Sequence, residues 1–375
     1  MRVEPSRVVL APVSITPTKP LTPTHVKGLL WLDVAYRATQ RVRSVDYLWN
    51  QRSATLTAQT VAFWAYLDRV AAGRQWSAVT GNEIGELYVR SHAEGSRPSR
   101  AVLAPYLERV DAEGWIHPAS VRLLELWREE LRLLGVGDPG LTADRPMALS
   151  TDETLDILAE RDLLVDHRRF GGPVLLDGPR WGLPLRQLVG PDGHPNYLVP
   201  ILRDLIPRAR HAERVVLVHD TELTQDYTTL DRVLGTLGAT VSRLALGRVP
   251  IGGAIRSSRH GDWAGVTLDH ISRACLEHVE LPVYQLGMRI YFIAVLQRGS
   301  RRSMEPELLR RCLWKARRIL SRVEQSGDTG ATAGAALLTK LCDDRGYVDP
   351  YGLTCRLLSR RRRTSAGPLL RQVYL

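Results

Sequence analysis

The feature that most constrains the fold is a strand–loop–helix unit at the N-terminus. Residues 8–13 (VVLAPV) are apolar and rich in β-branched side chains, which is typical of a buried strand. A polar, proline-rich loop follows, and residues 28–39 (GLLWLDVAYRAT) then carry apolar side chains at helical spacing. Further strands at residues 213–218 and 239–250 flank a helix at residues 228–238. This alternation of strands and helices predicts an α/β fold with parallel packing.

Helical patterns occupy most of the remaining chain. Four stretches between about residues 56 and 135 each have one apolar face, and the chain beyond about residue 265 is almost wholly helical. Residues 151–162 predict a short helix with Thr151 as its N-cap, and residues 171–178 predict a strand followed by a turn. We therefore expect a core over residues 1–265, with a helical insertion at about 56–170, and a shorter helical domain over residues 266–375.

Composition limits the class of protein. The formal net charge of +11 favours a polyanionic partner such as tRNA, ATP or the phosphopantetheine arm of a carrier protein, although an arginine-rich coding bias explains the charge equally well. The four consecutive arginines at 360–363 have the same two readings, a solvated tail or a nucleic-acid contact. No apolar run reaches the roughly 18 residues that span a bilayer, and no secretory signal is evident, so we expect a cytoplasmic protein without a membrane partner. Four irregularly spaced cysteines predict reduced thiols and no protein metal site.

The N-terminal loop carries a recognisable signature. Residues 12–33, PVSITPTKPLTPTHVKGLLWLD, resemble the arginyl-tRNA synthetase version of the HIGH signature of class I aminoacyl-tRNA synthetases, which runs approximately SSPNPTKPLHVGHLRGAVLGD. The residues in common are Pro17, Thr18, Lys19, Pro20, Leu21, His25, Gly28 and Asp33. Thr22 and Thr24 stand where the family has its first histidine and its glycine. The resemblance implies that Lys19, Thr22 and His25 stabilise charge on the α-phosphate of ATP, beside a helix N-terminus that also attracts anions.

A second half-motif follows late in the chain. Residues 249–265, VPIGGAIRSSRHGDWAG, resemble the KMSKS loop of the same family. The resemblance implies that Arg256, Ser258 and Arg259 bind the leaving pyrophosphate, with His260 nearby. Guanidinium groups suit this role because they form forked hydrogen bonds to phosphate oxygens.

The segments between these motifs also resemble the family, over about residues 8–320. The resemblance implies an α/β core of the Rossmann-like HUP type with helical insertions, followed by an all-helical C-terminal domain. The residues implied for ATP binding are Thr24, Gly28, His219, Asp220, Glu222 and His260. Those implied for the amino-acid pocket are Ser14, Thr16, Tyr197, Ile201 and Asp204.

One departure bears on the substrate. In arginyl enzymes an aspartate four residues after the motif tyrosine pairs with the substrate guanidinium, and here Tyr197 is followed at that position by Ile201. Asp204 lies one helical turn beyond, and the alternative is that Asp204 takes the place of the missing carboxylate and restores the contact to arginine. We therefore expect free arginine not to be the preferred amino acid, because a guanidinium against an isoleucine loses its ion pair.

The resemblance implies a Mg²⁺-ATP-dependent ligase. It forms an aminoacyl-adenylate and passes the acyl group to an amine, a carrier protein or tRNA, in the manner of the stand-alone paralogues of specialised metabolism. Two alternatives remain open. One is a catalytically inactive paralogue that binds tRNA or a protein, which the loss of several consensus residues favours. The other is a transferase that uses an already charged aminoacyl-tRNA.

Overall fold

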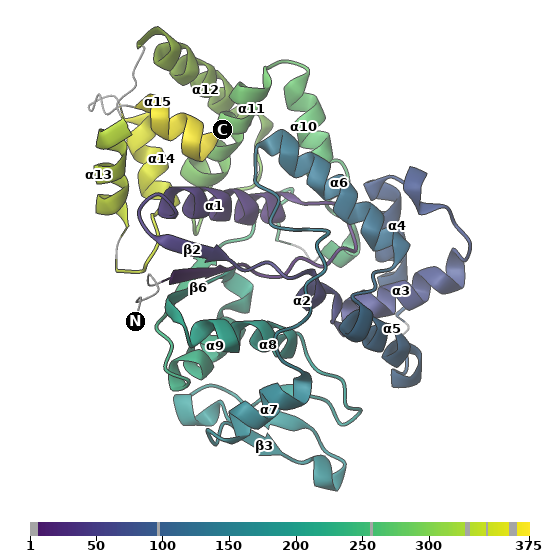
Figure 1. Ribbon diagram of the computed structural model, residues 1–375. Coiled ribbons are helices and arrows are strands. Elements are labelled where there is room, and N and C mark those ends of the chain that lie inside the picture. The colour runs from purple at the N-terminus through teal and green to yellow at the C-terminus, as the bar shows by residue number, and fades with distance from the viewer. Residues whose placement is uncertain (1–6, 96–97, 256–257, 327–330, 343, 360–365) are drawn as a thin grey trace.

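The computed structural model describes residues 7–95, 98–255, 258–326, 331–342, 344–359 and 366–375 (Figure 1). Its central sheet is fully parallel, with strand order β2-β1-β6-β7. The strands are β1 (Arg7–Ala11), β2 (Ser44–Tyr47), β6 (Ala212–Asp220) and β7 (Val241–Leu246). Three of them lie where the sequence predicts strands. The pattern analysis missed β2 because its sequence, SVDY, has two polar residues and is only half-buried.

Helices cover both faces of this sheet, which explains why its central strands are apolar without alternation. Val8 of β1 packs with α1 (Pro23–Thr39), whereas its neighbour Val9 packs on the opposite face with α8 (Leu198–Ala209) and α9 (Thr224–Thr236). Figure 1 shows α1 on one side of the sheet and α8 and α9 on the other. The predicted α/β class is therefore confirmed.

Helix α1 begins earlier than the expected start at residue 28. Thr22 has an extended backbone conformation and caps the helix, and Pro23 occupies its first turn, where a missing N–H costs nothing. His25 and Gly28 consequently lie on the helix and not in the preceding loop. The first turn of α1 therefore lies beyond the carboxyl end of β1, after the connecting loop.

The bounds of the expected helical insertion, about residues 56–170, stay a prediction. The helices in and next to the first part of that region are α2 (Gln51–Thr55), α3 (Ala58–Val70), α4 (Gly81–Ala93), α5 (Arg100–Glu113) and α6 (Pro118–Leu134). From α3 onward they pack around a hydrophobic cluster that includes Trp64 and Tyr88. A buried relay ties this unit to the N-terminal loop: the indole of Trp64 donates to Ser120 at 2.8 Å, and the Ser120 hydroxyl donates to the carbonyl of Pro17 at 2.6 Å. The insertion thus holds the loop that precedes α1.

A small antiparallel sheet follows the insertion. Strands β3 (Leu164–Asp166), β4 (Val174–Leu176) and β5 (Arg186–Val189) pair in the order β3-β4-β5, and they pack with α7 (Thr151–Ala159) and α8. The expected N-cap of α7, Thr151, is wrong by one residue. Ser150 caps the helix, because its hydroxyl accepts from the Glu153 N–H at 3.1 Å and its own N–H donates to the Glu153 carboxylate at 2.7 Å.

The chain after residue 265 is helical, as expected. It forms α10 (Leu268–Leu276), α11 (Leu281–Arg289) with a π-helical continuation (Ile290–Val295), α12 (Pro306–Ser326), α13 (Ala331–Leu341), α14 (Pro350–Leu358), and α15 (Ala366–Leu369) with a final π-helical turn (Leu370–Tyr374). The arginine run at 360–363 lies outside the described residues.

These helices share one hydrophobic cluster with α1 and the sheet. A buried ion pair reinforces the contact: the Arg289 guanidinium of α11 donates to the Asp33 carboxylate of α1 at 2.6 Å, and Arg37 donates to the same carboxylate at 2.9 Å. The boundary expected at residue 265 stays a prediction. Over the described residues, no helix is long and apolar enough to cross a membrane.

Candidate active site

A cavity of about 270 Å³ opens beyond the carboxyl ends of β6 and β7, where ligands bind in parallel α/β sheets. Its walls include the start of α1 and residues from the stretches 248–255 and 259–263, which follow β7. Six predicted site residues line it: Lys19, Thr22, Thr24 and His25 from the first half-motif, Arg259 from the second, and Asp220. The two half-motifs, far apart in the sequence, therefore meet at one cavity.

His25 is held as a neutral donor. Its Nδ1 accepts a hydrogen bond from the backbone N–H of Thr22 at 3.1 Å, so the ring proton resides on Nε2. Burial, followed by the positive charges of Lys19 and Arg248, lowers the pKa of His25 well below its usual value. The imidazole thus combines a fixed tautomer with an Nε2–H donor at the N-terminus of α1.

Three cationic side chains, Lys19, Arg248 and Arg259, line this same cavity. Lys19 is 5% exposed and lies over the ring of Tyr88, with its Nζ 5.1 Å from the centroid. Burial, then Arg248 and Arg259, lowers the pKa of Lys19 to about 8. Two guanidinium groups that lower the pKa of a lysine in the same cavity form with it a site that an anion stabilises.

The segment that resembles the KMSKS loop packs on the helical insertion. Arg259 donates to the side-chain oxygen of Gln59 at 3.3 Å, and Gln59 donates to the hydroxyl of Tyr88 at 2.7 Å. Trp263 is buried against α4 at Gly85, where an added Cβ would lie 2.3 Å from the indole ring. The insertion therefore supports this segment over the cavity.

The other residues predicted in that segment stand differently. Arg256 lies outside the described residues. Ser258 and His260 belong to a 3₁₀ turn, Ser258–His260, of which the Ser258 side chain is not described. His260 is exposed and is not among the residues that line the cavity.

A second cavity, of about 120 Å³, adjoins the first and shares Thr24, His25 and Asp220 with it. Its walls are mostly apolar and include Leu29, Leu32, Val218 and Leu246. Gly28 lines it too, and a Cβ added there would meet no atom within 4 Å. The Thr24 hydroxyl accepts from the backbone N–H of Val249 at 3.0 Å, which fixes α1 to the segment after β7.

The residues predicted for ATP binding within segment 219–222 have different surroundings: some lie at the cavities and one packs in the core. Asp220 lines both cavities and pairs with Arg248 at 3.1 Å, while Glu222 pairs with the same guanidinium at 2.6 Å. His219 forms part of the wall of the smaller cavity, but its imidazole stacks on Tyr227 of α9 at 4.6 Å between ring centroids. Asp220 and Glu222 therefore orient Arg248, and His219 packs in the core.

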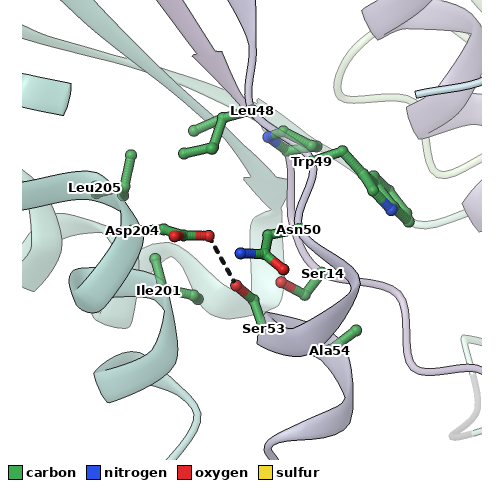
Figure 2. A pocket seen from close by; sticks show the side chains of 11 residues that line it. Ser14, Leu48, Trp49, Asn50, Ser53, Ala54, Ile201, Asp204 and Leu205 are labelled. Carbon is green, nitrogen blue, oxygen red and sulfur yellow. Dashed lines mark hydrogen bonds between the residues drawn. The ribbon is translucent and has the colours of Figure 1, made fainter. Parts of the chain in front are cut away.

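The residues predicted for the amino-acid pocket do not all line one cavity. Ser14, Ile201 and Asp204 line a third cavity, of about 30 Å³, with Ser14 shared with the apolar cavity (Figure 2). Thr16 lines the apolar cavity instead. Tyr197 lines neither, because its hydroxyl donates to Asp226 of α9, which also pairs with Arg186 at 2.9 Å.

Sequence reasoning missed several lining residues. Arg248 follows directly on the end of β7, so the rule that ligands bind at the carboxyl ends of parallel strands was the signal that pointed to it. Tyr88 lies in a segment that resembles the family but received no role. Gln59, Asn50 and Ser53 carry no local signal, since α2 and α3 approach the site only through tertiary packing.

The carboxylates at the large cavity are Asp220 and Asp262. Over the described residues, no group of three or more His, Cys, Asp or Glu side chains could hold a metal ion. Mg²⁺ is commonly bound by one or two carboxylates together with substrate phosphates. This donor set thus fits an ion that arrives with a nucleotide.

The parallel sheet, the covering helices and the cation-lined cavity at the strand ends define an α/β architecture in which ligands bind beyond the carboxyl ends of the strands. No protein-family model matches the chain, and no curated protein matches its sequence. In solved structures, the chain is similar to the arginyl-tRNA synthetase of Thermus thermophilus, with a TM-score of 0.65 and 14% identity over 99% of this chain and 79% of that one. It is also similar to the arginyl-tRNA synthetase of Plasmodium falciparum, with a TM-score of 0.56 and 11% identity over 95% of this chain and 64% of that one. The chain thus has the fold of arginyl-type class I aminoacyl-tRNA synthetases, as its signature motifs predict.

Proposed function

We propose that this protein binds ATP and activates the carboxylate of an amino acid as an aminoacyl-adenylate. The observation that carries the proposal is the convergence of Lys19, Arg248, Arg259 and the N-terminus of α1 on one cavity, next to a smaller apolar one. Phosphates require clustered cations and N–H donors, whereas a purine requires an apolar slot. Adjoining cavities of these two kinds suit a nucleoside triphosphate.

The proposed reaction develops negative charge at the phosphates. A carboxylate oxygen bonds to the α-phosphorus while the bond to the bridging oxygen breaks, and pyrophosphate leaves. His25 donates through Nε2–H, and Lys19 adds a charge that burial leaves poorly solvated. Arg259, together with Arg256, binds the leaving pyrophosphate. Preorganised donors of this kind stabilise developing charge because they need no reorganisation during the reaction.

The acyl acceptor in this proposal is an amine, a carrier protein or tRNA, and the setting is specialised metabolism. The formal net charge of +11 supports an anionic acceptor. A cytoplasmic location and a Mg²⁺ ion that accompanies ATP belong to the same proposal.

A second candidate is a catalytically inactive paralogue that binds tRNA or a protein. It draws support from Arg248, which Asp220 and Glu222 already neutralise, and from the threonines at positions 22 and 24. A transferase that uses charged aminoacyl-tRNA is the third possibility. It differs from the first candidate in that it needs no ATP. Only the first candidate exchanges pyrophosphate into ATP.

Two measurements test the proposal. Calorimetry with ATP and with a non-hydrolysable aminoacyl-sulfamoyl adenosine should show binding that Arg259→Ala weakens at least tenfold. Arg90→Ala on α4, an exposed arginine that does not line the cavity, is the matched control and should bind normally. Pyrophosphate exchange across a panel of amino acids should then identify a substrate. Absence of ATP binding at millimolar concentration would overturn the proposal, and binding without exchange would favour an inactive paralogue or a transferase.

A further inference from the structure

The smallest of the three cavities contains a buried carboxylate. It lies between the ends of β1 and β2, helix α2 and helix α8, and it shares Pro12, Ser14 and Trp49 with the apolar cavity. Figure 2 shows the Asp204 carboxylate facing the Ser53 hydroxyl, with Asn50 and Ser14 beside them. The cavity is therefore a recess with mainly apolar walls and a few polar side chains, next to the apolar cavity.

Asp204 is 3% exposed, and no ion pair reaches it from the described parts of the chain. Ser53 donates to Oδ2 at 3.5 Å, the backbone N–H of Ala148 donates to Oδ1 at 3.4 Å, and Asn50 also hydrogen-bonds to the carboxylate. Burial raises the pKa of Asp204, and the hydrogen bonds from Asn50 and Ala148, followed by the charge of Arg208 further along α8, oppose that shift only in part. A buried carboxylate without a cation is costly, so a ligand cation would gain more here than at a solvated carboxylate.

We propose that this recess binds a primary ammonium group of the amino acid that is activated. The proposal rests on the proposed function and specifies its substrate. An ammonium has three N–H donors, and the recess offers three oxygen acceptors for them, the Asp204 carboxylate and the hydroxyls of Ser14 and Ser53. The cavity volume of about 30 Å³ exceeds the roughly 10–15 Å³ that one water-sized group requires. A head group of one heavy atom fits that space.

A guanidinium fits this recess less well. It is planar, with a fork of donors that prefers to engage both carboxylate oxygens at once. Both oxygens of Asp204 already accept protein hydrogen bonds, and Ile201 and Leu205 contribute apolar walls. The sequence argument was directed against arginine and rested on Ile201 at the position of the family's aspartate. Because Asp204 lines the same recess, that argument holds against arginine but not against an ammonium.

The ammonium has two possible sources, the α-amino group or a side chain such as that of lysine. Calorimetry with lysyl-, norleucyl-, des-amino-norleucyl- and arginyl-sulfamoyl adenosine distinguishes them without any need for turnover. We expect the lysyl compound to bind at least tenfold more tightly than the norleucyl compound if the side chain occupies the recess. If the α-ammonium occupies it, lysyl and norleucyl compounds bind equally, and removal of the α-amino group weakens binding at least tenfold.

In either case, Asp204→Asn should abolish the preference and leave ATP binding unchanged. Asp111→Asn is the matched control, because this carboxylate pairs with the neighbouring Arg203 at 2.7 Å and lines none of the three cavities. Ser53→Ala, which removes one acceptor and keeps the carboxylate, should reduce the preference if Asp204→Asn does not fold. A tighter arginyl compound, or a preference that survives Asp204→Asn, would overturn the assignment. Failure of ATP itself to bind would instead overturn the proposed function.

Discussion

Gly28 offers a test in which stability and binding should change in opposite directions. It lies within α1 and lines the apolar cavity, and an added Cβ would meet no atom within 4 Å. A glycine inside a helix costs about 0.8–1.0 kcal/mol relative to alanine. Gly28→Ala should therefore raise the free energy of unfolding by up to about 1 kcal/mol and raise Tm by roughly 1–3 °C.

The same methyl group would project into the space that we assign to adenosine. Overpacking a fitted site by one methyl costs typically about 1–3 kcal/mol, which corresponds to an increase in Kd of roughly 5- to 150-fold. Thermal unfolding of the free protein and calorimetric titration with ATP measure the two effects separately. A variant that is at least as stable as the parent and binds ATP at least fivefold more weakly is the expected result.

Gly235→Ala on α9 is the matched control. This glycine is also helical, is exposed and has no atom within 4 Å of an added Cβ, but it lines none of the described cavities. It should leave ATP affinity unchanged. If Gly28→Ala retained full ATP affinity, the nucleotide would not lie over α1, and the assignment of the apolar cavity would be refuted.

Three further predictions concern charge. His25→Ala and Arg259→Ala should each slow adenylate formation at least tenfold, a barrier increase of about 1.4 kcal/mol or more, and full activity in either variant would remove that residue from the site. Because the pKa of Lys19 is about 8 and phosphate favours its protonated form, ATP affinity should fall as pH rises through about 8. Lys19→Arg should flatten that dependence, and an unchanged slope would contradict the role. Asp33→Ala leaves the Arg289 guanidinium buried without its carboxylate and should lower the free energy of unfolding by about 3–5 kcal/mol in denaturant titrations; a loss below about 1 kcal/mol would contradict it.

Local patterns sufficed for much of the fold. Strands β1 and β6 are recognisable because central parallel strands carry continuous apolar runs, and the edge strand β7 still has its buried Leu244 and Leu246 at alternate positions. The sequence analysis missed β2, at the other edge, because SVDY has two polar residues and none of its four residues is fully buried. The start of α1 was placed too late, since apolar spacing reports the buried face of a helix and not its polar first turn.

Local sequence patterns likewise predicted only part of the candidate site. Lys19, Thr22, Thr24 and His25 were predicted from one contiguous motif, and the structure brings them to one cavity. Tyr197 belongs to a motif too, yet its hydroxyl is bonded to Asp226, because α9 packs over that end of α8.

By itself, the sequence determined the α/β class, the synthetase-like fold and the loop that begins α1, because each depends on residues close together in the chain. The recess around Asp204 was decided by tertiary structure alone. Positions 201 and 204 point to nearly the same side of α8, so helical periodicity alone does not predict whether Ile201 or Asp204 faces the cavity. Only the packing of α2, which brings Ser53 opposite Asp204 across 151 residues of sequence, gives that carboxylate a cavity to face.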